Sequence, residues 1–169
     1  NGEAHFVEDK NGPPNRAYLK LYEALTLTGT TPQPGEFCID VGGSPGGWAW
    51  VVHQCGAEVL SIDRSLLAPS VAKLKGVSFQ RRDAFTLVPE EFKDRRIDWL
   101  FSDVICYPEK LYEWILKWVE SGICKNFICT IKFKGEPDLS IADKFSAIPG
   151  SQVRHLFRNK NELTWFKIS

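Results

Sequence analysis

Short, almost continuously apolar runs alternate along the chain with segments whose apolar residues are spaced as on one face of a helix. Such runs are typical of strands that helices cover on both faces. The expected strands lie at 37–41, 58–63, 77–83, 97–104 and 126–133. The expected helices between them lie at 45–56, 66–76, 88–94 and 107–122. Because strands that are joined through helices run parallel, this alternation predicts an α/β fold with a parallel sheet and right-handed crossovers.

The pattern changes at both ends of the chain. Residues 152–158 and 162–168 are predicted strands, and the three residues between them are too few for a crossover helix, so an antiparallel hairpin is expected. A helix that opens with two prolines is expected over 13–27. Together these elements predict a mostly parallel, seven-stranded sheet in a single domain over 14–169, preceded by a lead-in segment over 1–13.

Composition narrows the range of functions. Hydrophobic residues make up 43% of the 169 residues and charged residues 25%, as in ordinary globular domains. Lys+Arg and Asp+Glu both number 21, so attraction to a polyanion must come from local clusters of charge. No apolar run approaches the roughly 18 residues of a membrane span, and we expect a cytoplasmic location. The five cysteines form no CxxC pair and the three histidines are scattered, so no metal site is expected.

A glycine-rich loop follows the first predicted strand, in the stretch CIDVGGSPGGWAW (38–50). In an open α/β sheet, ligands bind at the carboxyl ends of the strands, and glycine allows close approach of the backbone. The loop lacks the Lys-Ser/Thr pair of a P-loop, because Trp48 follows the second glycine pair. Ser44 stands where a dinucleotide fingerprint has its middle glycine, which weakens a dinucleotide site without excluding it. S-adenosylmethionine, which carries no phosphate, is the third candidate.

Two aspartates end the next two predicted strands. Asp63 lies 21 residues after Gly42, where an acid can accept hydrogen bonds from ribose hydroxyls. Asp83 ends the third strand and is expected within reach of an adenine amino group. Either aspartate could equally well cap the turn that follows it. In combination with the glycine loop, they favour a site for S-adenosylmethionine.

The segment DVGGSPGGW (40–48) strongly resembles the first motif of the FtsJ-like ribose 2′-O-methyltransferases, D-x-G-x-x-P-G-G-[WF]. NRAYLKLYEA is similar to the leading-helix motif of that family, WLFSDV to its fourth-strand segment, TIKF to its fifth-strand lysine segment and NELTWF to its last-strand segment. Two positions depart from the pattern: Asn15 replaces a serine, and Val-Ile-Cys follows Asp103 in place of [ML]-[AS]-P. The resemblance implies a Rossmann-like class I methyltransferase fold. It also implies that S-adenosylmethionine is held by Asp40, Gly42, Ser44, Pro45, Gly46, Gly47, Trp48, Asp63, Asp83 and Asp103.

The resemblance further implies a catalytic set of Lys20, Asp103, Lys132 and Glu162. Topology independently predicts that three of them meet: Asp103 and Lys132 end parallel strands at the edge of the glycine loop, and the hairpin returns Glu162 to the same edge. The placement of Lys20 rests on the resemblance alone. Lys20 could instead be a solvated helix lysine, Asp103 a turn cap and Glu162 a charge on an edge strand. Lys132 is harder to explain structurally, because an interior strand rarely carries an unpartnered lysine.

The expected activity is methyl transfer from S-adenosylmethionine to a ribose 2′-hydroxyl of RNA. The segments PGGWAW and IKFK are most similar to bacterial enzymes that methylate a cytidine of large-subunit ribosomal RNA. Lys132 is expected to contact the 2′-oxygen, either as a base or as a cationic anchor. Expected phosphate contacts, which could also be ordinary surface charges, are Arg16, Lys134, Arg158 and Lys160.

Specificity for one RNA is expected from a further N-terminal domain, a partner protein or the shape of the RNA. The chain lacks methionine throughout, which is consistent with processing or with a longer natural protein. Three alternative functions stay open: methylation of an mRNA cap ribose, a catalytically inactive methyltransferase fold that serves as a binding module, and a nicotinamide oxidoreductase. Ser44 in the loop and the lack of a YxxxK pair disfavour the last.

Overall fold

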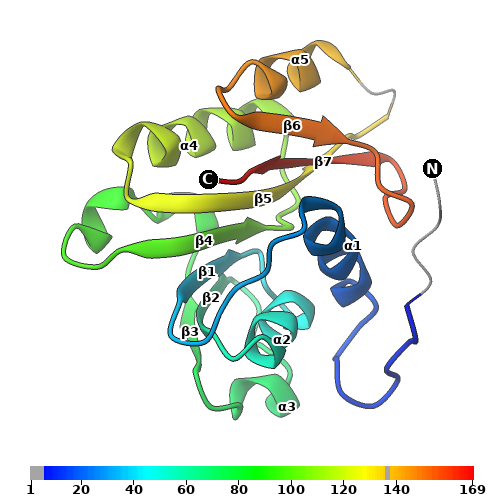
Figure 1. Cartoon of the computed structure of the whole chain (residues 1–169), viewed down its shortest axis with the longest axis vertical. Helices are drawn as coiled ribbons and strands as arrows, with labels where there is room; N and C mark the ends of the chain where they lie inside the picture. The colour runs from blue at the N-terminus through cyan, green and yellow to red at the C-terminus, as the bar shows by residue number, and fades with distance from the viewer. Residues whose placement is uncertain (1–5, 136–137) are drawn as a thin grey trace.

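The computed structural model describes residues 6–135 and 138–169 (Figure 1), so the first five residues of the expected lead-in segment lie outside it. Seven strands form one sheet in the order β3-β2-β1-β4-β5-β7-β6. The strands are β1 (Phe37–Val41), β2 (Glu58–Asp63), β3 (Val77–Arg81), β4 (Ile97–Ser102), β5 (Cys124–Lys132), β6 (Ser151–Arg154) and β7 (Glu162–Lys167). β1 to β5 pair in parallel, whereas β7 pairs antiparallel with both β5 and β6. The predicted mixed sheet and its C-terminal hairpin are confirmed.

Helices cover both faces of the sheet, as Figure 1 shows. One face carries α1 (Tyr18–Thr28), α2 (Gly47–Gln54) and α3 (Pro69–Ala72). The other carries α4 (Pro108–Ser121), α5 (Ser140–Ser146) and the short 3₁₀ helices η1 (Ala84–Thr86) and η2 (Pro89–Phe92). Within the described chain, no helix is both long and apolar enough to cross a membrane.

The buried apolar residues of the strands pack into two layers, one on either side of the sheet. Ile39 and Val41 of β1 pack into the layer under α4 and α5, whereas Cys38 packs into the layer under α1 and α2. All five residues of β1 are buried. This double coverage is the physical reason for the continuous apolar runs in the sequence, because neither face of a central strand meets water.

The helical segments differ from the predictions in length and type. Residues 66–76 contain only the four-residue α3, and 88–94 form the 3₁₀ helix η2 in place of an α-helix. Helix α1 begins at Tyr18, although 13–27 was the predicted span. The preceding residues turn against the glycine loop, where the side chain of Asn15 accepts a hydrogen bond from the Ala17 amide. Helix α5 was not predicted.

The hairpin also differs in its connection. β6 stops at Arg154, so the connection to β7 is longer than the three residues expected. The amides of Phe157 and Arg158 donate to the carboxylate of Glu23 on α1, at 2.6 and 2.9 Å. These bonds to a helix replace the pairing that would have extended β6, and they bring the connection beside α1.

Candidate active site

The glycine loop lies between β1 and α2, at the carboxyl end of the sheet. Strand order reverses there, because β1 is flanked by β2 on one side and β4 on the other. The amide of Gly42 donates to the carbonyl of Ile62 at 2.9 Å. Gly42 has φ +75°, and a β-carbon on it would meet the backbone of Val104 at 2.7 Å. A glycine is therefore required where the loop passes the residues that follow β4.

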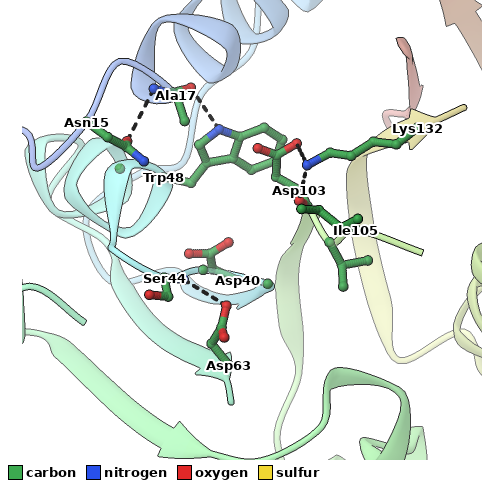
Figure 2. Close-up of a pocket in the computed structure, with 13 residues that line it drawn as sticks. Asn15, Ala17, Asp40, Ser44, Trp48, Asp63, Asp103, Ile105 and Lys132 are labelled. Carbon is green, nitrogen blue, oxygen red and sulfur yellow. Dashed lines mark hydrogen bonds and ion pairs between the residues drawn. The ribbon is translucent and has the colours of Figure 1, made fainter. Parts of the chain in front are cut away.

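A cavity of about 300 Å³ opens between this loop, the end of β4 and the end of β5 (Figure 2). Most of the residues predicted to hold a cofactor line it; they are Asp40, Gly42, Ser44, Gly47, Trp48, Asp63 and Asp103. Pro45 and Gly46 belong to the loop but do not line the cavity. The side chain of Trp48 donates to the carbonyl of Ala17 at 3.0 Å, which ties α2 to the start of α1.

Asp40 is fully buried beside this cavity, and its carboxylate is incompletely satisfied. One oxygen lies 3.4 Å from the hydroxyl of Ser61. The other has no hydrogen-bond partner among the described residues. Burial, reinforced by the negative charge of Asp103, raises the pKa of Asp40 to about 7. A cationic group in the cavity would stabilise the ionised form of this carboxylate.

Asp63 combines the two roles that its position suggests. One carboxylate oxygen accepts from the amide of Ser65 at 2.8 Å, which is a turn cap. The other accepts from the amide of Ser44 at 3.0 Å and holds the glycine loop (Figure 2). The carboxylate also lines the cavity, so the same side chain both holds the glycine loop and is available to a ligand.

Asp83 serves mainly as a cap in this structure. One oxygen accepts from the amide of Phe85, and the other pairs with Arg64. These bonds, first the backbone amide and then Arg64, lower the pKa of Asp83. Asp83 lines a smaller cavity of about 160 Å³, which shares Gly42, Asp63, Val104 and Ile105 with the larger one. It therefore lies beside the main cavity and does not line it.

The structure brings Lys20, Asp103, Lys132 and Glu162 together in one ion-pair network. The ammonium of Lys20 lies 2.7 Å from Glu162 and 3.0 Å from Asp103. The ammonium of Lys132 lies 3.0 Å from the same oxygen of Asp103. Glu162 and Lys132 are directly paired in the register of β7 and β5. The convergence at one sheet edge that topology predicted for three of these residues is observed, and α1 adds the fourth.

The structure removes the simpler explanations given above for Lys20 and Glu162. The side chain of Lys20 is only 12% exposed, so it is not a solvated helix lysine. Glu162 lies on β7, which has a neighbour on each side and is not an edge strand. Burial alone lowers the pKa of Lys20, but the attraction of Asp103 and Glu162 outweighs it and raises the pKa above the ordinary value. Lys20 is consequently held as an ammonium between two carboxylates.

A second cavity of about 500 Å³ lies on the other side of this network. Lys20 and Glu162 line it, whereas Asp103 and Lys132 line the first, and Ala17 lines both. Three of the four predicted phosphate contacts belong to the second cavity; they are Arg16, Arg158 and Lys160. Lys134 does not, because its ammonium lies over the ring of Tyr107 at 5.0 Å from the centroid.

Several lining residues escaped the reasoning from sequence. Asn15, Val104 and Ile105 line the first cavity. All three lie at the positions where the sequence departs from the expected motifs, so these departures were the available signal. No group of three His, Cys, Asp or Glu side chains within residues 6–135 and 138–169 is placed to hold a metal ion.

Comparison with known proteins matches residues 13–154 to the sequence profile of a family described as FtsJ-like methyltransferase. A ribosomal RNA large subunit methyltransferase M from Halorhodospira halophila is 31% identical over 159 residues, which are 89% of this chain and 46% of that protein. The chain spans about half the length of the curated relatives it matches.

Solved structures share the fold at lower identity. A protein from Lactococcus lactis, provisionally described as a hemolysin, has a TM-score of 0.73 at 18% identity and covers 95% of this chain and 93% of its own. Fibrillarin from Aeropyrum pernix, with natively bound S-adenosyl-L-methionine, has a TM-score of 0.61 at 17% identity over 90% of this chain and 76% of its own. At such identities the likeness shows the Rossmann-like class I methyltransferase fold.

Proposed function

Because the chain belongs to the FtsJ-like methyltransferase family, we propose that it transfers a methyl group from S-adenosylmethionine to a ribose 2′-hydroxyl of RNA. The observation that carries the proposal is the network of Lys20, Asp103, Lys132 and Glu162 between two cavities. One cavity, of about 300 Å³, offers carboxylates to a cationic donor, and the other is lined by Arg16, Arg158 and Lys160. Methyl transfer requires a donor and an acceptor that meet at the catalytic residues. A cavity on each side of the network would hold one of them.

The first cavity fits S-adenosylmethionine. The ligand carries an ammonium group at its zwitterionic amino-acid end, a cationic sulfonium and a ribose, and the cavity offers the carboxylates of Asp40, Asp63 and Asp103 around a glycine loop. The Asp40 oxygen that has no partner among the described residues is an acceptor that a cationic ligand would satisfy. When bound, S-adenosylmethionine supplies a methyl group that its positively charged sulfur has already made electrophilic.

The residues of the network would activate the ribose 2′-hydroxyl, which is a weak nucleophile. A ribose hydroxyl is almost fully protonated near neutral pH, so it has to be oriented and its proton or negative charge accommodated. Lys20 has two carboxylate partners and is held charged, which suits it to fixing Asp103 and Glu162 in place. Among residues 6–135 and 138–169, Lys132 has the single carboxylate partner Asp103, and it lines the donor cavity. Lys132 is therefore the residue that contacts the 2′-oxygen.

Two effects account for most of the expected rate. Holding the hydroxyl in line with the methyl group lowers the barrier by about 7–11 kcal/mol in favourable cases. Lys132 adds about 10²- to 10⁴-fold if its amine removes the proton, and as an ammonium it stabilises the developing alkoxide. The two roles differ in pH dependence, because only the first requires a neutral amine.

Large-subunit ribosomal RNA is the proposed substrate. The support is the 31% identity to a relative named for that RNA and the similarity of the glycine loop to the same group. Because the chain covers about half of such relatives, we propose that parts of a longer protein, or a partner, add specificity for one nucleotide. The cations Arg16, Arg158 and Lys160 would contact phosphates without reading the sequence.

The test is transfer of tritiated methyl groups from S-adenosylmethionine to large-subunit RNA transcribed in vitro. Lys132→Ala is expected to lower incorporation at least about 10²-fold while the donor still binds, because the glycine loop and the carboxylates of Asp40 and Asp63 keep their places in the cavity. Lys117→Ala, at an exposed position of α4 on the opposite face, is the matched control and should leave incorporation unchanged. Near-normal incorporation by Lys132→Ala would remove the assignment.

A further inference from the structure

The connection between β6 and β7 is fixed against α1 by side chains that the catalytic network does not use. The carboxylate of Glu23 accepts from the amides of Phe157 and Arg158, at 2.6 and 2.9 Å. Glu23 lies three residues after Lys20, so the anchor of the connection and the central lysine of the network share one stretch of helix. A shift of this loop would therefore change the second cavity directly beside Lys20.

Asn159 fixes the same connection from the other end. Its side-chain oxygen accepts from the amide of Leu156 at 2.8 Å and from the hydroxyl of Thr164 at 3.1 Å. Asn159 is 6% exposed, and its side-chain nitrogen has no partner in the described part of the chain. The Nε atom of Arg158 is likewise buried without a partner there. Unpaired buried donors are uncommon in native proteins, and both residues line the second cavity.

The remaining walls of this cavity add an aromatic face and positive charge. Phe157 is 60% exposed, and the guanidinium of Arg158 lies 5.6 Å from the centroid of its ring. Arg16 and Lys160 bring two cations. Proteins recognise unpaired RNA bases by stacking them on aromatic rings and by hydrogen bonds to their edges, and they hold phosphates with Arg and Lys. A cavity that combines these groups suits one nucleotide.

We propose that this cavity binds the acceptor nucleotide of the RNA, with its base against Phe157 and its phosphate toward Arg16 and Lys160, and that Glu23 positions the loop that forms it. The inference rests on the proposed function, because an acceptor site is meaningful only beside a donor site. Hydrogen-bond acceptors on the base edge would meet the donors of Arg158 and Asn159. The ribose would then lie beside Lys20 and Glu162, with its 2′-hydroxyl directed toward Lys132.

The experiment is a two-step NMR titration of the ¹⁵N-labelled chain, first with S-adenosylhomocysteine and then with cytidine 5′-monophosphate. The nucleotide is expected to shift the amides of 157–160 and the side-chain amide of Asn159. Shifts confined to other surfaces, or no shift, would overturn the acceptor site. The amides of Gly42 and Gly43 report the donor site separately. If S-adenosylhomocysteine leaves those two amides unchanged, the proposed function fails, whatever the nucleotide does.

Two variants test the roles of single residues in the same titration. Phe157→Ala is expected to weaken nucleotide binding at least about fivefold, because base stacking on an aromatic ring is lost. Leu27→Ala, at a half-exposed leucine of α1, is its control and should bind normally. Equal nucleotide affinity in the two variants would contradict the stacking role.

Glu23→Gln tests the positioning role. A glutamine oxygen cannot accept both amides as the two carboxylate oxygens do, so the loop should shift and nucleotide affinity should fall severalfold. Affinity for S-adenosylhomocysteine should stay unchanged, which a general loss of structure would not allow. The matched control is Glu113→Gln, at an exposed position of α4. Unaltered amide signals of 157–160 in Glu23→Gln would refute the role of Glu23.

Discussion

Asp40 makes the stability of this protein depend on pH in the direction opposite to that of most aspartates. Its side chain is fully buried, and one of its oxygens has no partner in the part of the chain that the structure describes; burial, followed by the charge of Asp103, raises its pKa to about 7 from an ordinary 3.8. Between these two pH values the folded protein holds a proton that the unfolded chain has released. Folding is therefore increasingly opposed as the pH rises through this window, and the full cost is present above about pH 7.

The magnitude follows from the two pKa values. A tenfold difference in proton affinity corresponds to about 1.4 kcal/mol, so the span from 3.8 to about 7 amounts to about 4 kcal/mol. Asp40→Asn keeps the shape of the side chain and removes the ionisation. The variant is expected to gain stability relative to the native protein as the pH rises from 4 to 7, by up to about 4 kcal/mol, with no further gain above.

Urea unfolding at a series of pH values measures this difference. The exposed Asp94→Asn serves as the control for the same chemical change. A free-energy difference between Asp40→Asn and the native protein that does not change from pH 4 to 8 would refute the reasoning. Saturating S-adenosylmethionine is expected to restore part of the lost stability of the native protein at pH 8 but less in the variant, because only the ionised carboxylate attracts the cationic ligand.

Three further substitutions test the geometry of the site. Gly43→Ala places a methyl group against the buried side chains of Asp40 and Ser61, so donor affinity should fall at least tenfold, which is about 1.4 kcal/mol. Calorimetry measures this affinity, and a native value would contradict the close packing. Trp48→Phe removes the hydrogen bond to the carbonyl of Ala17, which still accepts from the amide of Lys20, so the loss should be about 0.5–1.5 kcal/mol in urea unfolding; an unchanged midpoint would argue against that tie. Glu162→Gln takes one of two carboxylates from Lys20, so the methylation rate should fall while donor affinity holds, and a parallel loss of both would count against a role in chemistry.

Much of the sheet and part of the site could be predicted from the sequence, because both depend on local patterns. Continuous apolar runs located the strands, and the strand ends then fixed the edge at which Asp103, Lys132 and Glu162 meet. The glycine loop could be recognised in the sequence because the close backbone contact at Gly42 permits no side chain. These features follow from chain connectivity and sterics, which a single sequence carries.

The rest depends on how separate elements dock. Nothing in the pattern of α1 says that Lys20 turns toward Asp103, because its apolar stripe fixes a buried face but not the partner beneath it. Residues 155–158 were predicted as strand and 159–161 as a short turn, because the anchor of this connection, Glu23, lies more than a hundred residues away in sequence. Helix α5 had a usable signal in the spacing of two buried apolar residues four positions apart, but the segment is only seven residues long.

The position of the transferred methyl group on the RNA distinguishes a ribose 2′-O-methyltransferase from a base methyltransferase. Large-subunit RNA transcribed in vitro is incubated with the chain and labelled S-adenosylmethionine, digested to nucleosides and analysed by mass spectrometry. We expect the label on the ribose, as a 2′-O-methylnucleoside, and we expect Lys132→Ala to abolish it. A label on a base, or no transfer from a donor that is demonstrably bound, would contradict the proposed function.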